Sequence, residues 1–240
     1  IDWRMAQCAA RDVSFHFNTW AEAEDVTALN PDLVIVATGG LPQMRLYEPM
    51  EDLPHVITSW DILSGDVKAS GDVLIFDEAG DHAGLQAAEI AADTAKVEIM
   101  TPDRSFAPDV MGLNLTPYLT NLQDKDVTVT VARRLKGVQR DGNRLIAEIG
   151  SDYSAKVQDR PYDQIILNYG TLPNADLYFD LKPLSSNLGQ VDHEALITGQ
   201  LQNVVANPEG RFQLFRIGDA VAARNPHAAI YDALRLLKDL

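Results

Sequence analysis

The chain has 240 residues, 46% of them hydrophobic, which is enough for one or two domains that each bury a core. Its 20 basic and 35 acidic residues give a formal net charge of −15, and so acidic a surface repels nucleic acid and anionic membranes. The longest apolar run, at residues 33–37, falls far short of the roughly 20 residues that a membrane helix needs. We therefore expect neither nucleic acid nor a membrane as a partner.

A single cysteine, Cys8, and five scattered histidines limit the possible metal and redox chemistry. One thiol forms no intrachain disulfide, which is typical of a reducing compartment and predicts a cytoplasmic protein. It also cannot supply the thiolates of an iron–sulfur cluster or of a usual structural zinc site. No two histidines have the i,i+4 spacing of a helical metal site, so we expect no metal site in this sequence.

The first residue is Ile1 rather than Met, and no signal-peptide pattern follows it, so we expect an excised or processed piece. Residues 2–11 have the apolar spacing of a helix, and residues 13–17 alternate like a short strand. Residues 21–29 indicate a polar turn or a short helix. The run at 33–37 is mostly β-branched and ends at a glycine pair, as in a parallel strand buried on both faces.

Residues 41–71 hold several prolines and no strong period, which indicates a connection that contains a short helix at 60–63. A strand at 72–76, a helix at 83–95 and a strand at 96–100 then form a βαβ unit, which is almost always right-handed. The remaining expected elements are a helix at 109–123, strands at 127–131, 135–140, 145–149, 162–167 and 211–217, and a helix at 227–238. The dipeptide at 141–142, Asp-Gly, predicts a hairpin turn between two of these strands. The pattern predicts an α/β fold with a mainly parallel sheet, arranged as two stacked nucleotide-binding-type lobes.

Three expected strands end in glycine, asparagine or aspartate, at residues 37–40 (Ala-Thr-Gly-Gly), 168–170 (Asn-Tyr-Gly) and 217–219 (Ile-Gly-Asp). Ligands of open α/β sheets bind outside the carboxyl ends of the strands. A glycine there allows a ligand close to the backbone, and an aspartate can accept hydrogen bonds from ribose or ribityl hydroxyls. Each motif alone is usually a turn or a helix cap, but the ordered set predicts that Thr38 and Asp219 line one groove for an adenine-bearing ligand.

The order and spacing of these strand ends resemble flavoproteins with two dinucleotide-binding domains of the glutathione-reductase-like fold. Residues 33–39 resemble their "ATG" strand, residues 215–220 their C-terminal "GD" strand, and residues 165–174 the strand that closes the inserted NAD(P)H-type lobe. The combination is most similar to the C-terminal half of the trimethylamine dehydrogenase and 2,4-dienoyl-CoA reductase family of NADH:flavin oxidoreductases. Residues 224–235 are similar to its oxidative N-demethylase branch.

The resemblance implies two Rossmann-like lobes, the first of them incomplete. Residues 1–66 with 186–240 would form an FAD- or ADP-type lobe without its first glycine-rich βαβ unit, and residues 67–185 would form an inserted NAD(P)H-type lobe. In that family an N-terminal (β/α)8 barrel carries FMN and the catalytic residues, and four cysteines hold a 4Fe-4S cluster. The resemblance therefore implies that the catalytic residues and the amine substrate belong to a barrel outside this sequence, which would be the partner of these lobes.

The resemblance also implies a partial FAD or ADP site in the first lobe. The family's G-x-G-x-x-G fingerprint for the flavin lobe is absent from the sequence, so FAD or ADP binding would be weak or absent in this piece. The residues that would remain of the site are Thr38, Gly39, Gly218 and Asp219, with Ala220 and His227 as further candidates. Asp219 would contact the ribityl or diphosphate region, and Thr38 and Gly39 would pass near the diphosphate or the adenosine end.

The inserted lobe departs from the fingerprint that the resemblance implies for NAD(P)H. Residues 77–84 read Asp-Glu-Ala-Gly-Asp-His-Ala-Gly, and only Gly84 matches, as the third glycine that serves helix–strand packing. The carboxylates of Asp77, Glu78 and Asp81 would repel a pyrophosphate. We therefore expect poor NAD(P)H binding, which favours the amine-oxidising branch over the enoyl reductase branch.

We expect the nucleotide-binding fragment of a flavin-dependent oxidoreductase that acts on methylated amines or as an NADH:flavin oxidoreductase, without turnover of its own. Two alternatives stay open: a structural or interaction module with degenerate nucleotide sites, and a fragment of an NAD(P)H-dependent enoyl-CoA-type reductase. Binding of ADP or FAD would favour the first function, and NADPH binding at residues 77–84 the last. The three tryptophans, among them Trp20, are expected to be packing residues, and the acidic run at 22–25 a solvated face.

Overall fold

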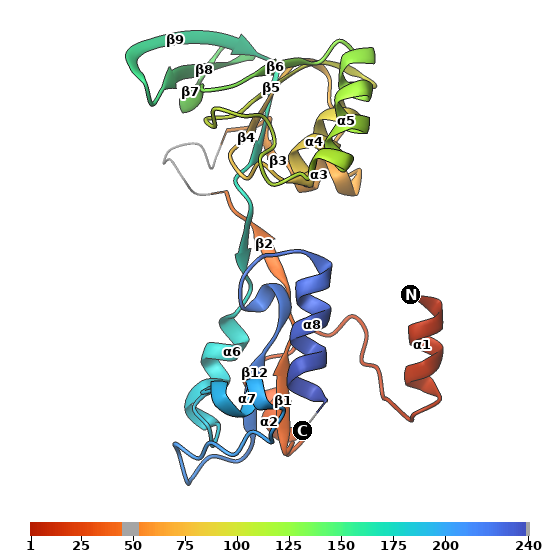
Figure 1. Ribbon diagram of the computed structural model, residues 1–240. Helices are drawn as coiled ribbons and strands as arrows, with labels where there is room; N and C mark the ends of the chain where they lie inside the picture. Colours follow the sequence, from red (N-terminus) through yellow and green to blue (C-terminus); the bar gives the residue numbers. More distant parts are fainter. Residues whose placement is uncertain (45–52, 239–240) are drawn as a thin grey trace. The chain divides into compact units, whose positions relative to one another are not determined.

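The computed structural model describes residues 1–44 and 53–238, which divide into two compact units (Figure 1). Unit 1 comprises Ile1–Gly39 and Asn174–Leu240, and unit 2 comprises Gly40–Pro173. Residues 45–52, part of the expected connection at 41–71, lie outside the described residues. No helix of the described part of the chain is long and apolar enough to cross a membrane.

Unit 2 is built on a five-stranded parallel sheet with the strand order β3-β10-β4-β5-β6. Its strands are β3 (Val56–Thr58), β4 (Gly71–Asp77), β5 (Ala95–Met100), β6 (Thr128–Thr130) and β10 (Gln164–Asn168). The central strand β4 carries an unbroken buried run, as expected when both faces of a parallel sheet are covered. Its side chains alternate between two cores, with Val73 and Ile75 in one and Leu74 and Phe76 in the other.

Helices cover one face of this sheet and an antiparallel sheet covers the other (Figure 1). The helices are α3 (Ser59–Ser64), α4 (His82–Ala91) and α5 (Gly112–Asp124), and the second sheet contains β7 (Arg134–Asp141), β8 (Arg144–Ser151) and β9 (Ser154–Tyr162). The core on the helical side contains Leu85 and Leu122, and the core on the other side contains Leu135 and Leu145. A short antiparallel ribbon of β2 (Gly40–Pro42) and β11 (Thr171–Pro173) completes unit 2.

The expected βαβ unit is confirmed as β4-α4-β5, and the expected hairpin turn at 141–142 joins β7 to β8. The strand expected at 162–167 is confirmed as β10, which begins two residues later, at Gln164, because Tyr162 ends β9. Residues 154–160 form most of β9 although no strand was expected there. Their side chains are almost all exposed and mostly polar, so this edge strand lacks the sustained apolar alternation by which strands are usually predicted.

Unit 1 contains a two-stranded parallel sheet, in which β1 (Leu33–Val36) pairs with β12 (Gln213–Arg216). Its helical elements are α1 (Asp2–Ala9), α2 (Ala23–Ala28), α6 (Asp176–Leu181), η1 (Lys182–Leu184), α7 (His193–Thr198), η2 (Gly218–Ala220) and α8 (Pro226–Leu237). A small core joins Val36 of β1 to Tyr178 and Leu181 of α6 and to Leu214 of β12. These elements confirm the expected strand pair and C-terminal helix.

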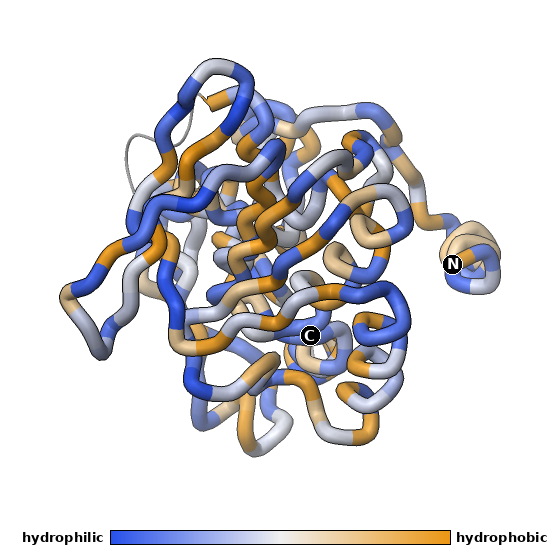
Figure 2. The backbone as a smooth tube through the Cα atoms, turned by 90° about the horizontal axis from the view of Figure 1, so that it is seen from above, coloured by the Kyte–Doolittle hydropathy of each residue, from blue (hydrophilic) through white to orange (hydrophobic). Residues whose placement is uncertain are grey.

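The N-terminal segment of unit 1 departs from expectation. Residues 13–17 adopt turns and irregular structure rather than the expected strand, and Phe15 stacks on Phe17 with ring centroids 5.4 Å apart. A strand needs a neighbour for its N–H and C=O groups, and within the described residues this segment pairs with no strand. Figures 1 and 2 show an extended stretch that separates α1 from the other elements of unit 1. Apolar side chains of this segment, such as Trp3 and Phe17, are exposed.

The unit boundaries differ from those expected, which were 1–66 with 186–240 and 67–185. Strand β2 pairs with β11 and strand β3 pairs with β10, so the chain from Gly40 onward belongs to unit 2. Helix α6 packs on β12, so the chain from Asn174 onward belongs to unit 1. The sequence pattern located the elements but not their packing partners, which decide the boundary.

Candidate functional site

The carboxyl ends of β1 and β12 lie side by side in unit 1, as the sequence predicted. The strands are parallel with Val36 opposite Arg216, and the Ile217 N–H donates to the Val36 carbonyl over 3.0 Å. Thr38 and Gly39 follow directly after β1, and η2, which contains the other three strand-end candidates, follows β12. The two strand ends are therefore neighbours at one edge of the same sheet.

Gly218 is held tightly against α8. Its φ is +61°, a backbone conformation that favours glycine, and a β carbon at this position would lie 3.3 Å from the Ala229 side chain. Its N–H donates to Oδ2 of Asp232 over 3.1 Å. The glycine thus serves the close approach of the helix, and its N–H already has an acceptor within the chain.

The other candidates near η2 also have partners in unit 1. Oδ1 of the partly buried Asp219 accepts the Arg224 N–H over 3.2 Å, and the carbonyl of the buried Ala220 accepts from the Arg216 guanidinium over 3.2 Å. Helix α8 begins at Pro226, and its N-cap residue Asn225 accepts the Ala228 N–H over 2.9 Å. His227 is exposed in the first turn of α8.

Two side chains that were not among the sequence-predicted candidates, those of Asp232 and Arg216, bind the backbone of η2. The buried carboxylate of Asp232 on α8 accepts from the Gly218 N–H and forms an ion pair with Arg224. The Arg216 guanidinium lies over the ring of Tyr178, 4.6 Å from the centroid. An aspartate inside an amphipathic helix, eight residues after an arginine, has no recognised spacing pattern, so only the fold reveals the pair.

A cavity of about 640 Å³ opens beside Thr38 in unit 1. It is lined by Thr19, Trp20, Ala21, Glu22, Ala23, Glu24, Thr38, Asn174, Asp176, Leu177 and Asp180. The Thr38 hydroxyl donates to the Asn174 carbonyl, and the Asn174 N–H donates to the Gly39 carbonyl over 3.0 Å, which fixes this wall. Every charged side chain of the lining is acidic, so the cavity suits hydroxyl donors or a neutral ring better than a phosphate.

Trp20 at the cavity is 83% exposed, so the expectation that it is a packing residue is wrong. An exposed indole offers a flat apolar face on which a planar base can stack. In the sequence, Trp20 lies two residues before the acidic run at 22–25, and this proximity was the signal that could have placed it at the cavity. The acidic run at 22–25, which was expected to be a solvated face, also has structural contacts. Glu22 caps α2, and Glu22 and Glu24 line the cavity.

A second strand-end cluster lies in unit 2, where β4 and β10 end in Asp77 and Asn168. The Asn168 side-chain amide donates to Oδ1 of Asp77 over 2.8 Å and to Oδ1 of Asp81 over 3.0 Å, and its own Oδ1 accepts the Ser59 hydroxyl over 2.9 Å. Burial raises the pKa of Asp77 to about 6, partly opposed by the Asn168 hydrogen bond. This cluster lies at the carboxyl edge of the parallel sheet, where ligands of such sheets bind.

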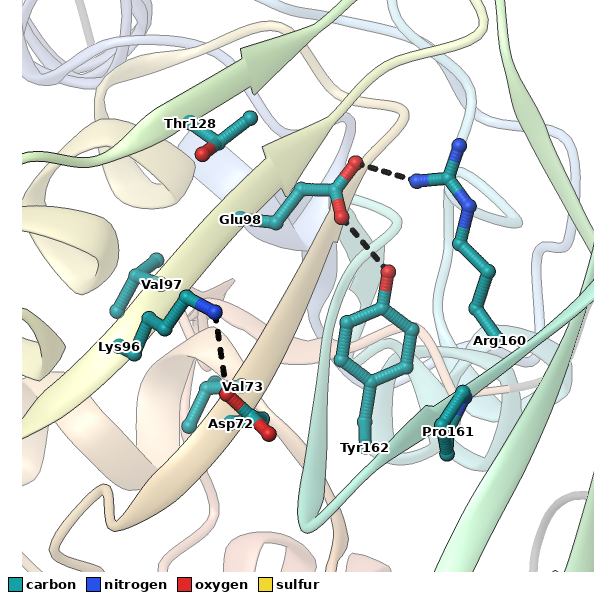
Figure 3. Close-up of a pocket in the computed structure, with 9 residues that line it drawn as sticks. All are labelled: Asp72, Val73, Lys96, Val97, Glu98, Thr128, Arg160, Pro161 and Tyr162. Carbon is teal, nitrogen blue, oxygen red and sulfur yellow. Dashed lines mark hydrogen bonds and ion pairs between the residues drawn. The ribbon is translucent and has the colours of Figure 1, made fainter.

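Another cavity of unit 2, of about 280 Å³, lies near the amino-terminal parts of β4, β5 and β6 (Figure 3). Its charged groups bind one another: Glu98 accepts from Arg160 over 2.8 Å and from the Tyr162 hydroxyl over 2.7 Å, and Lys96 faces Asp72 at 3.7 Å (Figure 3). Ligands of parallel sheets bind at the opposite, carboxyl edge. We interpret this cavity as a structural ion-pair network between the two sheets of unit 2.

Among the described residues, no group of three or more histidine, cysteine, aspartate or glutamate side chains could hold a metal ion. Cys8, the lone cysteine, lies on α1 and is partly buried. The carboxylates of both strand-end clusters are held by hydrogen bonds from this chain's own donors, as described above for Asp219 and Asp77.

No protein-family model matches the chain. It is 60% identical over 241 residues to a probable N-methylproline demethylase of Rhizobium meliloti (strain 1021), an alignment that covers 100% of this chain and 35% of that protein. It is 38% identical to the N,N-dimethylglycine/sarcosine dehydrogenase of Chromohalobacter salexigens, covering 99% of this chain and 36% of that protein. It is 30% identical to the multifunctional alkene reductase/demethylase OYE of Caballeronia cordobensis, covering 98% and 35%. The chain thus spans about a third of the length of these relatives.

Solved structures agree in fold. A 2-naphthoyl-CoA reductase superposes with a TM-score of 0.74 at 20% identity, covering 98% of this chain and 31% of that chain. The histamine dehydrogenase from Rhizobium sp. 4-9 gives 0.73 at 21% identity, covering 98% and 34%. The flavoprotein disulfide reductase RclA from Escherichia coli gives 0.58 at 16% identity, covering 82% and 42%. With its relatives, this fold shows that the chain belongs to the trimethylamine dehydrogenase and 2,4-dienoyl-CoA reductase family of flavin-dependent oxidoreductases, and that it corresponds to the C-terminal part of these relatives.

Proposed function

We propose that the chain is the nucleotide-binding part of a flavin-dependent oxidoreductase that oxidises a methylated amine, and that unit 1 provides the adenosine side of its FAD or ADP site. The observation that carries the site is the adjacency of the β1 and β12 ends, next to the cavity of Thr38 and Trp20. The substrate class is supported by the names of the relatives at 60% and 38% identity, which are a demethylase and a dehydrogenase of N-methylated amino acids.

The residues of unit 1 fit the adenosine end of such a ligand. Carboxylates such as Asp176 and Asp180 can accept hydrogen bonds from ribose hydroxyls, and the exposed Trp20 ring can stack on adenine. The Thr38 hydroxyl is available as an acceptor after it donates to Asn174. The adenosine would therefore lie along the wall made by the β1 end and the segment before α2.

The same residues do not fit a diphosphate. The Gly218 N–H is already bound to Asp232, Asn225 caps α8, and the cavity contains no basic side chain. We propose that the diphosphate donors come from the part of the relatives that this chain does not cover. That part would also carry FMN, the 4Fe-4S cluster and the catalytic residues on a barrel, which would be the partner of these lobes.

Titration calorimetry of the 240-residue chain with ADP and FAD tests this proposal. We expect ADP to bind weakly, and Trp20→Ala to lower its affinity about tenfold or more, because a base–aromatic stack contributes roughly 1–3 kcal/mol. Trp3→Ala is the matched control, because Trp3 is exposed in the same unit but does not line the cavity. If neither ADP nor FAD gives a detectable heat of binding, the alternative of an interaction module with degenerate nucleotide sites replaces this proposal.

A turnover assay with N-methylated amino acids and an artificial electron acceptor tests whether the catalytic groups lie outside this chain. We expect no turnover by the 240-residue chain, because all the catalytic groups of the proposed reaction lie on the barrel. Amine oxidation by the purified chain would contradict the assignment of these groups to another part of the enzyme.

A further inference from the structure

The loop between β4 and α4 is where dinucleotide-binding βαβ units present backbone N–H groups to a pyrophosphate. In this chain several of those groups have internal acceptors. The N–H groups of Glu78 and Ala79 donate to the Asn168 carbonyl over 3.0 and 3.1 Å. The Gly80 N–H donates to Oδ1 of Asp77 over 2.9 Å, and the Ala83 N–H donates to Oδ1 of Asp81 over 2.9 Å. Side-chain carboxylates thus take hydrogen bonds that a phosphate would otherwise take.

The Asp77 carboxyl also lies against the first turn of α4. A β carbon at Gly84, in the first turn of α4, would lie 2.7–2.9 Å from all three atoms of that carboxyl group. The glycine that serves close helix–strand packing therefore also accommodates the Asp77 carboxyl. Oδ2 of Asp77 is buried without a hydrogen-bond partner among the described residues, so the carboxyl is held by packing as well as by its hydrogen bonds.

Asn168 orients both carboxylates, because its amide nitrogen donates a hydrogen bond to Asp77 and another to Asp81. The neighbouring Glu78 is bound to Arg134 over 2.6 Å, so this nearby cation is not free for a phosphate either. The NAD(P)-type fold is present, yet the residues at its ligand edge do not fit NAD(P)H.

We infer that Asp77 and Asp81 act as an internal substitute for the pyrophosphate of a nicotinamide dinucleotide and thereby exclude NADH and NADPH from unit 2. This assigns the two aspartates as specificity-determining residues. The inference does not depend on the proposed adenosine site, which belongs to unit 1 and is tested with ADP.

The test compares NADH and NADPH binding to the 240-residue chain and to Asp77→Gly/Asp81→Ser, by calorimetry and by hydrogen–deuterium exchange. Serine keeps an N-cap for α4 while it removes the charge. We expect the double variant to bind at least about tenfold more tightly than the unmodified chain, with new exchange protection at residues 77–84. Protection confined to residues 19–38 would instead report on the cavity of unit 1.

Asp124→Asn/Asp159→Asn is the matched control, because it removes two exposed carboxylates of unit 2 away from the loop. Thermal melts verify folding, and Asp77→Ser/Asp81→Ser is the second variant if the first does not melt cooperatively. The inference is overturned if the unmodified chain shows NADH or NADPH protection at 77–84. It is equally overturned if a folded variant gains no affinity, or if the control gains as much.

Discussion

At the scale of single residues, several glycines and polar side chains have a function that only their neighbours explain. Gly84 is the one glycine of the expected fingerprint that the sequence retains, and it accommodates a carboxylate of the same chain. Gly218 accommodates α8, and its N–H is bound to Asp232. The sequence predicted the packing role of Gly84, whereas it listed Gly218 as a cofactor-binding candidate, and the structure shows Gly218 packed against α8.

Gly84→Ala is expected to destabilise the chain by roughly 1–3 kcal/mol, because the new methyl group would overlap the Asp77 carboxyl. Gly112→Ala is the matched control, because a β carbon there meets nothing within 4 Å and the position begins a helix. Urea unfolding of both variants measures the difference. Equal stability of the two variants would show that Asp77 can move away at little cost.

Asp77 should make stability depend on pH. Burial raises its pKa in the folded protein from 3.8 to about 6, so the folded state binds a proton more readily than the unfolded state in this range. The stabilisation is complete below about pH 4 and is lost as pH rises through 6, by about 3 kcal/mol at most. We expect the unfolding free energy of the unmodified chain, relative to Asp77→Asn, to fall between pH 4 and 7. A difference that stays constant over this range would contradict the assignment.

At the scale of elements, β12 has a neighbouring strand on one side only among the residues that the structure describes, and a side chain satisfies its backbone on the other side. The buried Asn187 side chain donates to the Leu214 carbonyl and accepts the Leu214 N–H, each over 2.9 Å. It thereby satisfies the backbone of β12 as a neighbouring strand would. By contrast, residues 13–17 carry an alternating pattern without a strand partner in the described part of the chain, and they form no strand.

Asn187→Ala is expected to lower the unfolding free energy by roughly 2–4 kcal/mol, because it leaves the buried N–H and C=O of Leu214 without partners. Asn203→Ala is a suitable control, since Asn203 is exposed and makes one long hydrogen bond of 3.5 Å. Chemical denaturation distinguishes the two. A cost below 1 kcal/mol for Asn187→Ala would mean that water or a shifted loop replaces the amide.

At the scale of the molecule, the two units differ in how much of a core each contains. Unit 2 has a helical and a strand-lined core on the two faces of its parallel sheet, and both cores lie wholly within Gly40–Pro173. Unit 1 has one smaller core, contributed by two chain segments far apart in sequence. The ends of these segments meet where the Asn174 N–H donates to the Gly39 carbonyl.

We expect residues 40–173 to fold on their own, because the excision cuts through no core cluster of unit 2. Circular dichroism and a cooperative thermal transition measure this. Unit 1, joined from 1–39 and 174–240 by a short glycine linker, should melt at a lower temperature because it buries less apolar surface. Loss of cooperative melting in the excised unit 2 would contradict the division into units.

The sequence by itself determined the α/β class, the βαβ unit, the strand ends at Thr38 and Asp219 and the family. These follow from local information, because buried parallel strands require apolar runs and strand-end turns require glycine or aspartate. The acidic loop at 77–84 was also visible in the sequence as a poor match to a dinucleotide fingerprint.

Only the tertiary structure decided which elements share a core, and therefore where the units divide. It also decided that Asp232 binds the Gly218 N–H, that Trp20 lines a cavity, and that Asp77 lies against Gly84. The partners in these contacts come from separate elements, and residues 77 and 168 are brought together by strand pairing alone. Pairing of distant strands depends on the packing of the whole sheet, which no local pattern in the chain encodes.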